Sequence, residues 1–193
     1  MTYSSAIFQN EKESLKEAQE NKYQLLIDNL NIKPHHQVLE IGCGWGGFAE
    51  YTAKKIGCSI KGVTISPNQL KFASDRIKKS NLEKKVSFEL CDYRDIKGKY
   101  DRVVSIEMIE AVGEKYWPVY FSQIKNLLKP NGKAAIQVIT IDDRYFDKGW
   151  YSCRRCFNWC NYFYNHGCKR CIMDAKKTGS FTCRTQRFHI SCS

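Results

Sequence analysis

The sequence lacks any long hydrophobic run. No segment approaches the roughly 18 consecutive apolar residues that a membrane-spanning helix needs, and the first residues show no signal-peptide pattern. Internal repeats and low-complexity tracts are not apparent either. A chain of 193 residues, 42% of them hydrophobic, can nevertheless bury a real core. We therefore expect one cytoplasmic domain that contains most of the chain.

Acidic residues are scarce at the C-terminal end, and this scarcity divides the chain in two. Residues 148–193 contain nine Lys/Arg and one Asp, a balance of +8, together with seven of the ten cysteines. Residues 1–147 contain 22 basic and 19 acidic residues, a balance of only +3. The net charge of +11 is therefore unevenly distributed. We expect a folded domain over 1–147 and a cysteine-rich basic tail over 148–193.

Up to that boundary, expected helices and strands alternate. Apolar residues at three- and four-residue steps make 117–128 the clearest helix, ended by the KPNG turn at 129–132. Helices are expected at 11–30, 46–56, 67–79 and 117–128, and strands at 37–42, 58–64, 86–91, 102–106 and 133–140. This alternation predicts an α/β fold with a doubly wound, Rossmann-like parallel sheet that is covered on both faces.

The segment 38–47, VLEIGCGWGG, joins an apolar strand to a glycine turn. Its glycines have the G-x-G-x-x-G spacing that lets a backbone pass close to a bound nucleotide. Dinucleotide sites and S-adenosylmethionine (AdoMet) sites both use this spacing. A nicotinamide site would also have a carboxylate about 20 residues downstream for the ribose, but no acidic residue lies between Glu50 and Asp75. Glu40 can instead hold a cationic amino group, so the segment favours AdoMet.

Polar side chains follow the next strands at their carboxyl ends, where ligands bind in such sheets. Residues 64–69, TISPNQ, offer groups that can hydrogen-bond a ribose without a charge. Asp92 stands where an acceptor for the adenine amino group is expected. Residues 107–113, EMIEAVG, follow the fourth strand. We expect these loops to form the walls of the AdoMet site.

These segments resemble the cyclopropane-fatty-acyl-phospholipid synthases and their mycolic-acid relatives. The resemblance covers residues 2–147 and rests on YSSA, VLEIGCGWGG, GVTIS-x-x-Q, DYRD, YDRVVSIEMIEAVGEKYW and AIQVITIDDRYF. It implies transfer of a methyl group from AdoMet to the cis double bond of an acyl chain in a membrane phospholipid. The resulting carbocation loses a proton and closes to a cyclopropane, with a bound bicarbonate as the proposed base. The resemblance therefore implies peripheral contact with a membrane and no nucleic-acid partner.

The resemblance also implies which residues contact AdoMet. They belong to the N-terminal segment, the glycine turn, the ribose loop and the ends of the third and fourth strands. The expected contacts are Tyr3, Ser4, Glu40, Gly42, Cys43, Gly44, Trp45, Gly46, Thr64, Ser66, Gln69, Asp92, Tyr93 and Ile106.

A second group of residues is implied for catalysis. Glu110 matches the glutamate of the family's E-H-V-G motif, a bicarbonate ligand, and backbone groups of Ser5 and Ile139 fall where they reach the same anion. Gln137 stands where many members have histidine, and Ala111 replaces the histidine of the motif. A glutamine amide can donate a hydrogen bond to bicarbonate but cannot hold a proton. Glu110 and Gln137 are the predicted catalytic residues, although on local chemistry alone Glu110 could equally be a carboxylate favoured by a helix start.

The family's C-terminal third, which closes over the acyl chain, is not recognisable in residues 148–193. We expect a truncated or frame-shifted tail without a metal site, and the resemblance leaves open whether this form is active. One alternative is a zinc module that contacts nucleic acid, because two C-x-x-C pairs flank eleven residues. Its ligands would be Cys153, Cys156, Cys168 and Cys171. Another alternative is a small-molecule AdoMet methyltransferase.

Overall fold

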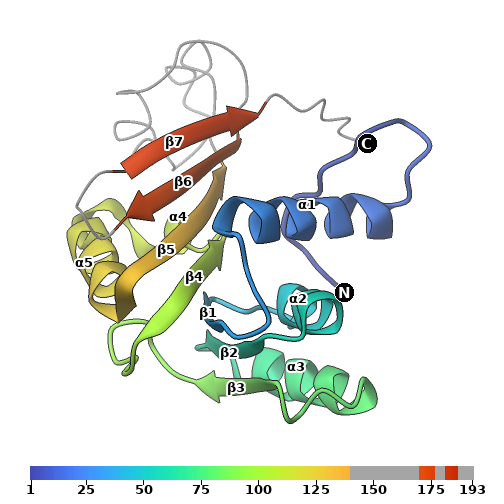
Figure 1. The fold of residues 1–193 in the computed structure, drawn as a ribbon, viewed down its shortest axis with the longest axis horizontal. Coiled ribbons are helices and arrows are strands. Elements are labelled where there is room, and N and C mark those ends of the chain that lie inside the picture. Colours follow the sequence, from blue (N-terminus) through green and yellow to red (C-terminus); the bar gives the residue numbers. More distant parts are fainter. Residues whose placement is uncertain (140–169, 177–180, 187–193) are drawn as a thin grey trace.

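A computed structural model describes residues 1–139, 170–176 and 181–186. Its centre is a seven-stranded sheet with the order β3-β2-β1-β4-β5-β6-β7 (Figure 1). Neighbouring strands from β3 to β5 run parallel, whereas β6 is antiparallel to both β5 and β7. The strands are β1 (Gln37–Ile41), β2 (Ser59–Thr64), β3 (Val86–Leu90), β4 (Tyr100–Ile106), β5 (Leu128–Ile139), β6 (Arg170–Lys176) and β7 (Phe181–Gln186). The helices are α1 (Leu15–Leu30), α2 (Gly47–Ile56), α3 (Pro67–Lys79), α4 (Ile109–Val112) and α5 (Trp117–Leu127), with a 3₁₀ turn at Glu114–Tyr116.

Helices cover both faces of the sheet, as the alternation of elements predicts. Val103 and Val104 are neighbours on β4, so their side chains point to opposite faces. Val103 lies in one buried cluster with Tyr120 of α5. Val104 lies in a second cluster with Leu26 of α1 and Phe48 of α2. The predicted α/β fold with a doubly wound sheet is confirmed.

Local signals set most of the boundaries between elements. A capping box between Ser14 and Glu17 begins α1 at Leu15, four residues later than predicted. Ser66 caps α3, which begins at a proline as expected. Gly57 ends α2 with a φ of +78°, a left-handed conformation that glycine adopts readily.

The predicted turn at 129–132 is wrong in its detail. α5 ends at Leu127, and β5 already begins at Leu128, which pairs with Tyr100 of β4. The pairing register then shifts between Tyr100 and Arg102, and Asn131 has a φ of +62°. Leu128 is buried in the core beneath α5, so the chain enters the sheet before the turn residues. The turn signal therefore marks an irregular start of the strand.

Two strands lie in the segment after residue 147, where the sequence predicted none. β6 pairs along β5, with Arg170 opposite Ile139 and Lys176 opposite Lys133. The backbone of these strands continues the sheet beyond β5 (Figure 1). Of the alternative zinc ligands, Cys171 lies on β6, and the other three cysteines lie outside the described residues.

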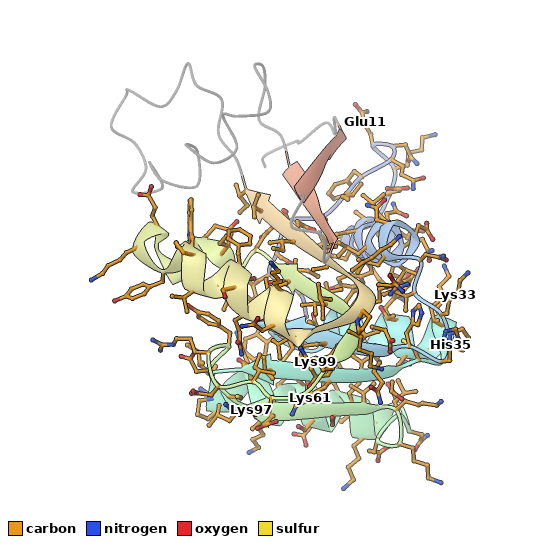
Figure 2. All side chains as sticks on the ribbon, turned by 60° about the vertical axis from the view of Figure 1, so that its left-hand side comes forward. Glu11, Lys33, His35, Lys61, Lys97 and Lys99 are labelled. Carbon is orange, nitrogen blue, oxygen red and sulfur yellow. The ribbon has the colours of Figure 1, made fainter. Side chains whose placement is uncertain are left out.

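Several polar side chains of the connections face outward. Figure 2 shows Glu11, Lys33, His35 and Lys97 at the periphery of the molecule, and all four are exposed. Among the described helices, none combines the length and the apolar character that crossing a bilayer requires.

Candidate functional site

A cleft of about 490 Å³ lies at the carboxyl ends of β1 to β4. Many of the predicted AdoMet contacts line it, namely Tyr3, Gly42, Gly44, Thr64, Ser66, Gln69, Asp92, Tyr93 and Ile106. A smaller cavity of about 30 Å³ adjoins it and is lined by the further predicted contacts Ser4, Glu40, Cys43 and Trp45. Gly46 lies behind the turn, where an added Cβ would stand 3.0 Å from both Ala73 and Phe88. The structure thus brings the predicted contacts together, with Gly46 in a packing position.

The glycine turn holds the backbone of the site against β2. The amides of Gly42 and Cys43 both donate to the carbonyl of Val63, at 3.0 and 2.9 Å. Gly44 has a φ of +52°, and a Cβ on it would stand 3.6 Å from the ring of Tyr3 on the cleft wall. Burial raises the pKa of the Cys43 thiol, whose residue is 4% exposed. Burial thus disfavours the reactive thiolate, and Cys43 is suited to filling space beside the turn.

Glu40 is a buried carboxylate beside the small cavity. The residue is 2% exposed, and its Oε2 atom has no hydrogen-bond partner. Burial raises its pKa to about 8, although the positive charges of Lys22 and Arg76 oppose that rise. A cationic group placed at Oε2 would satisfy this atom and stabilise the ionised carboxylate. Glu40 is therefore suited to hold the ammonium group of a ligand.

The loop after β2 is organised by hydrogen bonds among its own polar groups. Thr64 Oγ1 donates to Gln69 Oε1 at 2.7 Å and accepts from the amide of Ser66 at 3.1 Å. Ser66 in turn accepts from the amide of Gln69 at the start of α3. These contacts fix an uncharged polar wall on the cleft, as predicted for a ribose loop.

Asp92 is engaged by its own loop. Arg94 donates to its carboxylate through the backbone amide, Nε and Nη2, at 2.9, 2.8 and 2.7 Å. These hydrogen bonds hold the pKa of Asp92 below its usual range. Tyr93, which lies between Asp92 and Arg94 in the sequence, packs edge-on against Tyr120 with the ring centroids 5.3 Å apart. An adenine contact at Asp92 would have to share the carboxylate with Arg94.

The predicted catalytic residues lie on two neighbouring elements, and each contacts a different part of the site. Glu110 Oε1 accepts a hydrogen bond from the backbone amide of Ile139 at 2.7 Å, while its Oε2 is buried without a partner. Burial raises the pKa of Glu110, and the charge of Glu107 adds to that rise. Gln137 is 1% exposed and donates through Nε2 to Glu107 Oε1 at 2.8 Å and to Ser5 Oγ at 3.3 Å. Gln137 is thus bonded to the carboxylate of Glu107, whereas Glu110 is bonded to the backbone of β5.

The sequence analysis placed Glu107 in the loop that follows the fourth strand but gave it no role of its own. The amide of Ser5 donates to both of its carboxylate oxygens, at 3.1 and 3.2 Å, and the Ser5 hydroxyl also donates to Oε1. Its φ of +50° is uncommon for a residue with a side chain. The sequence signal was its position directly after β4, at the end of a strand. The family motif drew attention to Glu110 instead.

Lys22 and Gln19 were also missed. Both lie on α1 and are buried, and Lys22 donates to Gln19 Oε1 at 2.5 Å and to Ser4 Oγ at 2.6 Å. Gln19 Nε2 donates to the Ser4 carbonyl at 2.6 Å. These residues fasten the N-terminal segment, including Tyr3, to the edge of the cleft. A sequence pattern gives no signal for such a contact between a helix and a preceding irregular segment.

A parallel doubly wound sheet, a glycine turn after β1 and a cleft at the strand ends are features that the AdoMet-dependent methyltransferases share with other nucleotide-binding folds. The buried, unpartnered carboxylate oxygen of Glu40 favours the methyltransferase class. The chain belongs to the mycolic acid cyclopropane synthetase family, whose model matches residues 1–167. The match extends past residue 147, further than the sequence motifs indicated.

Two curated relatives have the same share of identical residues. The tuberculostearic acid methyltransferase UfaA1 of Mycobacterium tuberculosis is 41% identical over 148 residues, which are 73% of this chain and 34% of that protein. The cyclopropane-fatty-acyl-phospholipid synthase of Escherichia coli K12 is 41% identical over 132 residues, which are 68% of this chain and 33% of that protein. The chain therefore spans about a third of the length of these relatives.

A solved structure extends the likeness to three dimensions. The mycolic acid cyclopropane synthase CmaA1, crystallised in complex with SAH and CTAB, aligns with a TM-score of 0.71 and 26% identity. The alignment covers 84% of this chain and 57% of CmaA1. The aligned part of this chain thus has the same fold as the aligned part of CmaA1.

Proposed function

We propose that the cleft binds AdoMet and that the chain transfers its methyl carbon to the double bond of an unsaturated phospholipid acyl chain. The residues present fit this cofactor. Glu40 offers a buried, unpartnered carboxylate oxygen to its ammonium group, and the loop 64–69 offers uncharged polar groups to its ribose. Asp92 and Tyr93 line the part of the cleft that suits its adenine. When bound, AdoMet supplies an electrophilic methyl group on a sulfonium that leaves as a neutral thioether.

The apolar rim of the cleft is the observation that best supports a lipid substrate. Tyr3, Ile65 and Tyr116 all line the cleft, yet they are 72%, 76% and 46% exposed. Apolar side chains gathered at a cleft mouth are typical of sites that receive an apolar partner. The names of the two relatives, a methyltransferase of a fatty acid and a synthase of cyclopropane fatty acyl phospholipids, support an acyl chain. Peripheral contact with a membrane surface is part of this proposal.

Glu110 and Gln137 are proposed to shape the reacting centre. Gln137 directs its amide N–H toward the cleft-lining carboxylate of Glu107, and Glu110 holds the end of β5 through the amide of Ile139. Donors and charges fixed in a dry site stabilise a charged transition state without reorganising. Bicarbonate, which the resemblance implied as the base, would have to reach donors that the carboxylates of Glu107 and Glu110 already occupy.

Binding and lipid analysis test the proposal separately. Calorimetry with the full chain should detect binding of AdoMet or S-adenosylhomocysteine, and no binding of NAD. Lipids from a host without cyclopropane fatty acids should gain about 14 mass units per acyl chain, the mass of one CH₂ group, when the protein is expressed.

Glu110→Gln should lower that product strongly and leave AdoMet affinity near normal, whereas Glu83→Gln, an exposed residue at the opposite end of the strands, should change neither. If AdoMet does not bind, the site assignment is wrong. Undiminished product from Glu110→Gln would remove its role.

A further inference from the structure

The donors that the family resemblance assigns to an external anion are occupied by carboxylates of this chain. The Ser5 amide donates to both oxygens of Glu107 at 3.1 and 3.2 Å, and Gln137 Nε2 donates to Glu107 Oε1 at 2.8 Å. The third donor, the amide of Ile139, donates to Glu110 at 2.7 Å. The Ser5 hydroxyl adds a further hydrogen bond to Glu107. The donors that the resemblance assigns to bicarbonate are thus already bonded to two carboxylates of the protein.

We propose that Glu107 is the proton acceptor of the reaction and takes the place of a bound bicarbonate. This inference rests on the proposed alkyl transfer. Glu107 lines the cleft together with Ile106 and Met108, in the space where the cofactor and acyl chain would meet. A carboxylate can accept a proton, which the amide of Gln137 cannot. Gln137 stands where many family members have histidine and cannot serve as a base. Glu107 therefore supplies the basic group that this position lacks.

Between the two glutamates, the geometry favours Glu107. Glu107 is partly exposed in the cleft and is held by donors from two distant segments, the N-terminal segment and β5. Glu110 holds the backbone of Ile139, and its other oxygen is buried. A base needs an oxygen within reach of the substrate, and of the two glutamates it is Glu107 that lines the cleft. Glu110 is a positioning residue for the end of β5.

Alkyl transfer and the proton loss that follows it need no proton acceptor other than the carboxylate of Glu107. The π pair of the double bond forms the new C–C bond to the transferred carbon, and the C–S pair leaves with sulfur. The neighbouring substrate carbon becomes a cation. The transferred carbon then gives a proton to Glu107, and the freed C–H pair closes a ring or forms a double bond. Glu107, now a carboxylic acid, returns the proton to water.

An anion titration tests the position of Glu107 without any turnover. The full-length chain, labelled with ¹⁵N, is titrated with sodium bicarbonate while the side-chain amide signal of Gln137 is followed. The wild type should show no saturable shift, because Glu107 occupies the donors. Glu107→Ala should show one, because its donors are free. Glu107→Gly, which suits the positive φ, serves as a second variant in case the alanine form does not fold, and Glu83→Ala should behave like the wild type. A saturable shift in the wild type, or none in either Glu107 variant, overturns the proposal.

Lipid analysis tests the chemistry. Glu107→Gln should lower the alkylated lipid by about 100-fold or more, the usual loss on removing a general base, with AdoMet affinity within about twofold of wild type. Added bicarbonate should restore part of the product in Glu107→Ala. Wild-type amounts of product from Glu107→Gln would overturn the role of Glu107 alone. If the wild type binds AdoMet but alkylates no lipid, the proposed function fails, and the anion titration still decides whether Glu107 fills the anion site.

Discussion

Lys22 of α1 donates a hydrogen bond to the hydroxyl of Ser4 at 2.6 Å. This contact joins the first helix to the irregular segment that precedes it. Gln19 accepts from the same ammonium group and donates to the Ser4 carbonyl, so the hydroxyl and the carbonyl of Ser4 are both held. The segment thereby lies beside the glycine turn, where Tyr3 approaches Gly44. Part of the cleft wall depends on a lysine that is 1% exposed.

Lys22→Met should loosen this wall. Removing a charged donor from a buried hydrogen bond costs about 1.5 to 3 kcal/mol, and Ser4 would then be held by Gln19 alone. We expect AdoMet affinity to fall by about 10-fold or more, which corresponds to about 1.4 kcal/mol, with faster proteolysis of the first residues. Lys33→Met, at an exposed lysine after α1, is the matched control. Calorimetry and timed proteolysis measure both effects, and unchanged affinity in Lys22→Met would refute the coupling.

Substitutions at Gly44 and Gly57 can separate the effect of backbone strain from the effect of blocking the cleft. Both have positive φ, +52° and +78°, so valine at either position is strained by about 1 to 2 kcal/mol. A Cβ at Gly44 would lie on the cleft wall near Tyr3, whereas one at Gly57 would meet nothing within 4 Å. Gly44→Val should abolish AdoMet binding, and Gly57→Val should lower thermal stability with binding retained. Equal binding by Gly44→Val and wild type would remove the turn from the site.

Glu40 should couple AdoMet binding to the release of a proton. Its pKa is raised to about 8 by burial, against the opposing charges of Lys22 and Arg76, so it is mostly protonated in the free protein at neutral pH. A bound ammonium group favours the ionised form. Affinity should therefore rise with pH, by up to about tenfold per pH unit, until the pH nears 8, where the ligand's own ammonium group also loses its proton. Calorimetry in buffers of different ionisation enthalpy counts the released proton. Glu40→Gln should bind weakly and independently of pH, and a pH-dependent Glu40→Gln would assign the proton elsewhere.

Glu50 should contribute to stability against acid. Burial alone would raise its pKa, but hydrogen bonds from Lys54, Ser80 and Arg76 together lower it to about 2 from the ordinary 4.5. A lowered folded-state pKa stabilises the protein above pH 4.5, and this contribution is lost as the pH falls toward 2. After allowance for solvent screening we expect about 1 to 2 kcal/mol. Urea unfolding of wild type and Glu50→Gln should give free energies of unfolding that differ at pH 5 and converge near pH 2. Parallel values at every pH would contradict the assignment.

Much of the fold could be predicted because its signals are local. The strands β1 to β5 read as short apolar or β-branched runs, and Ser66, Pro67 and Gly57 mark helix ends by their own backbone preferences. The cleft followed from a general rule about the carboxyl ends of parallel strands. By contrast, Leu128 enters the sheet early because its partner Tyr100 is on another strand, and no local signal encodes that pairing.

The chemistry of the site was harder to predict because it depends on distant contacts. Ser5 and Glu107 are separated by 102 positions in the sequence, and Gln137 comes 30 positions after Glu107. The residues next to Glu107 in the sequence give no signal of its positive φ or of the three groups that donate hydrogen bonds to it. The family motif pointed to this loop and to Glu110 within it.

The last prediction concerns the cysteine-rich segment. A zinc module would bring the sulfur atoms of Cys153, Cys156, Cys168 and Cys171 to about 2.3 Å from one metal ion. Cys171 lies on β6, whose backbone pairs with β5 over its whole length, so this part of the segment continues the sheet of the AdoMet-binding domain. We therefore expect the purified chain to contain no stoichiometric zinc and to keep its thermal stability in the presence of a chelator, because binding energy is folding energy in small metal domains. Metal analysis by mass spectrometry decides the matter. One zinc per chain, lost when Cys168 and Cys171 are both changed to serine, would establish the zinc module instead.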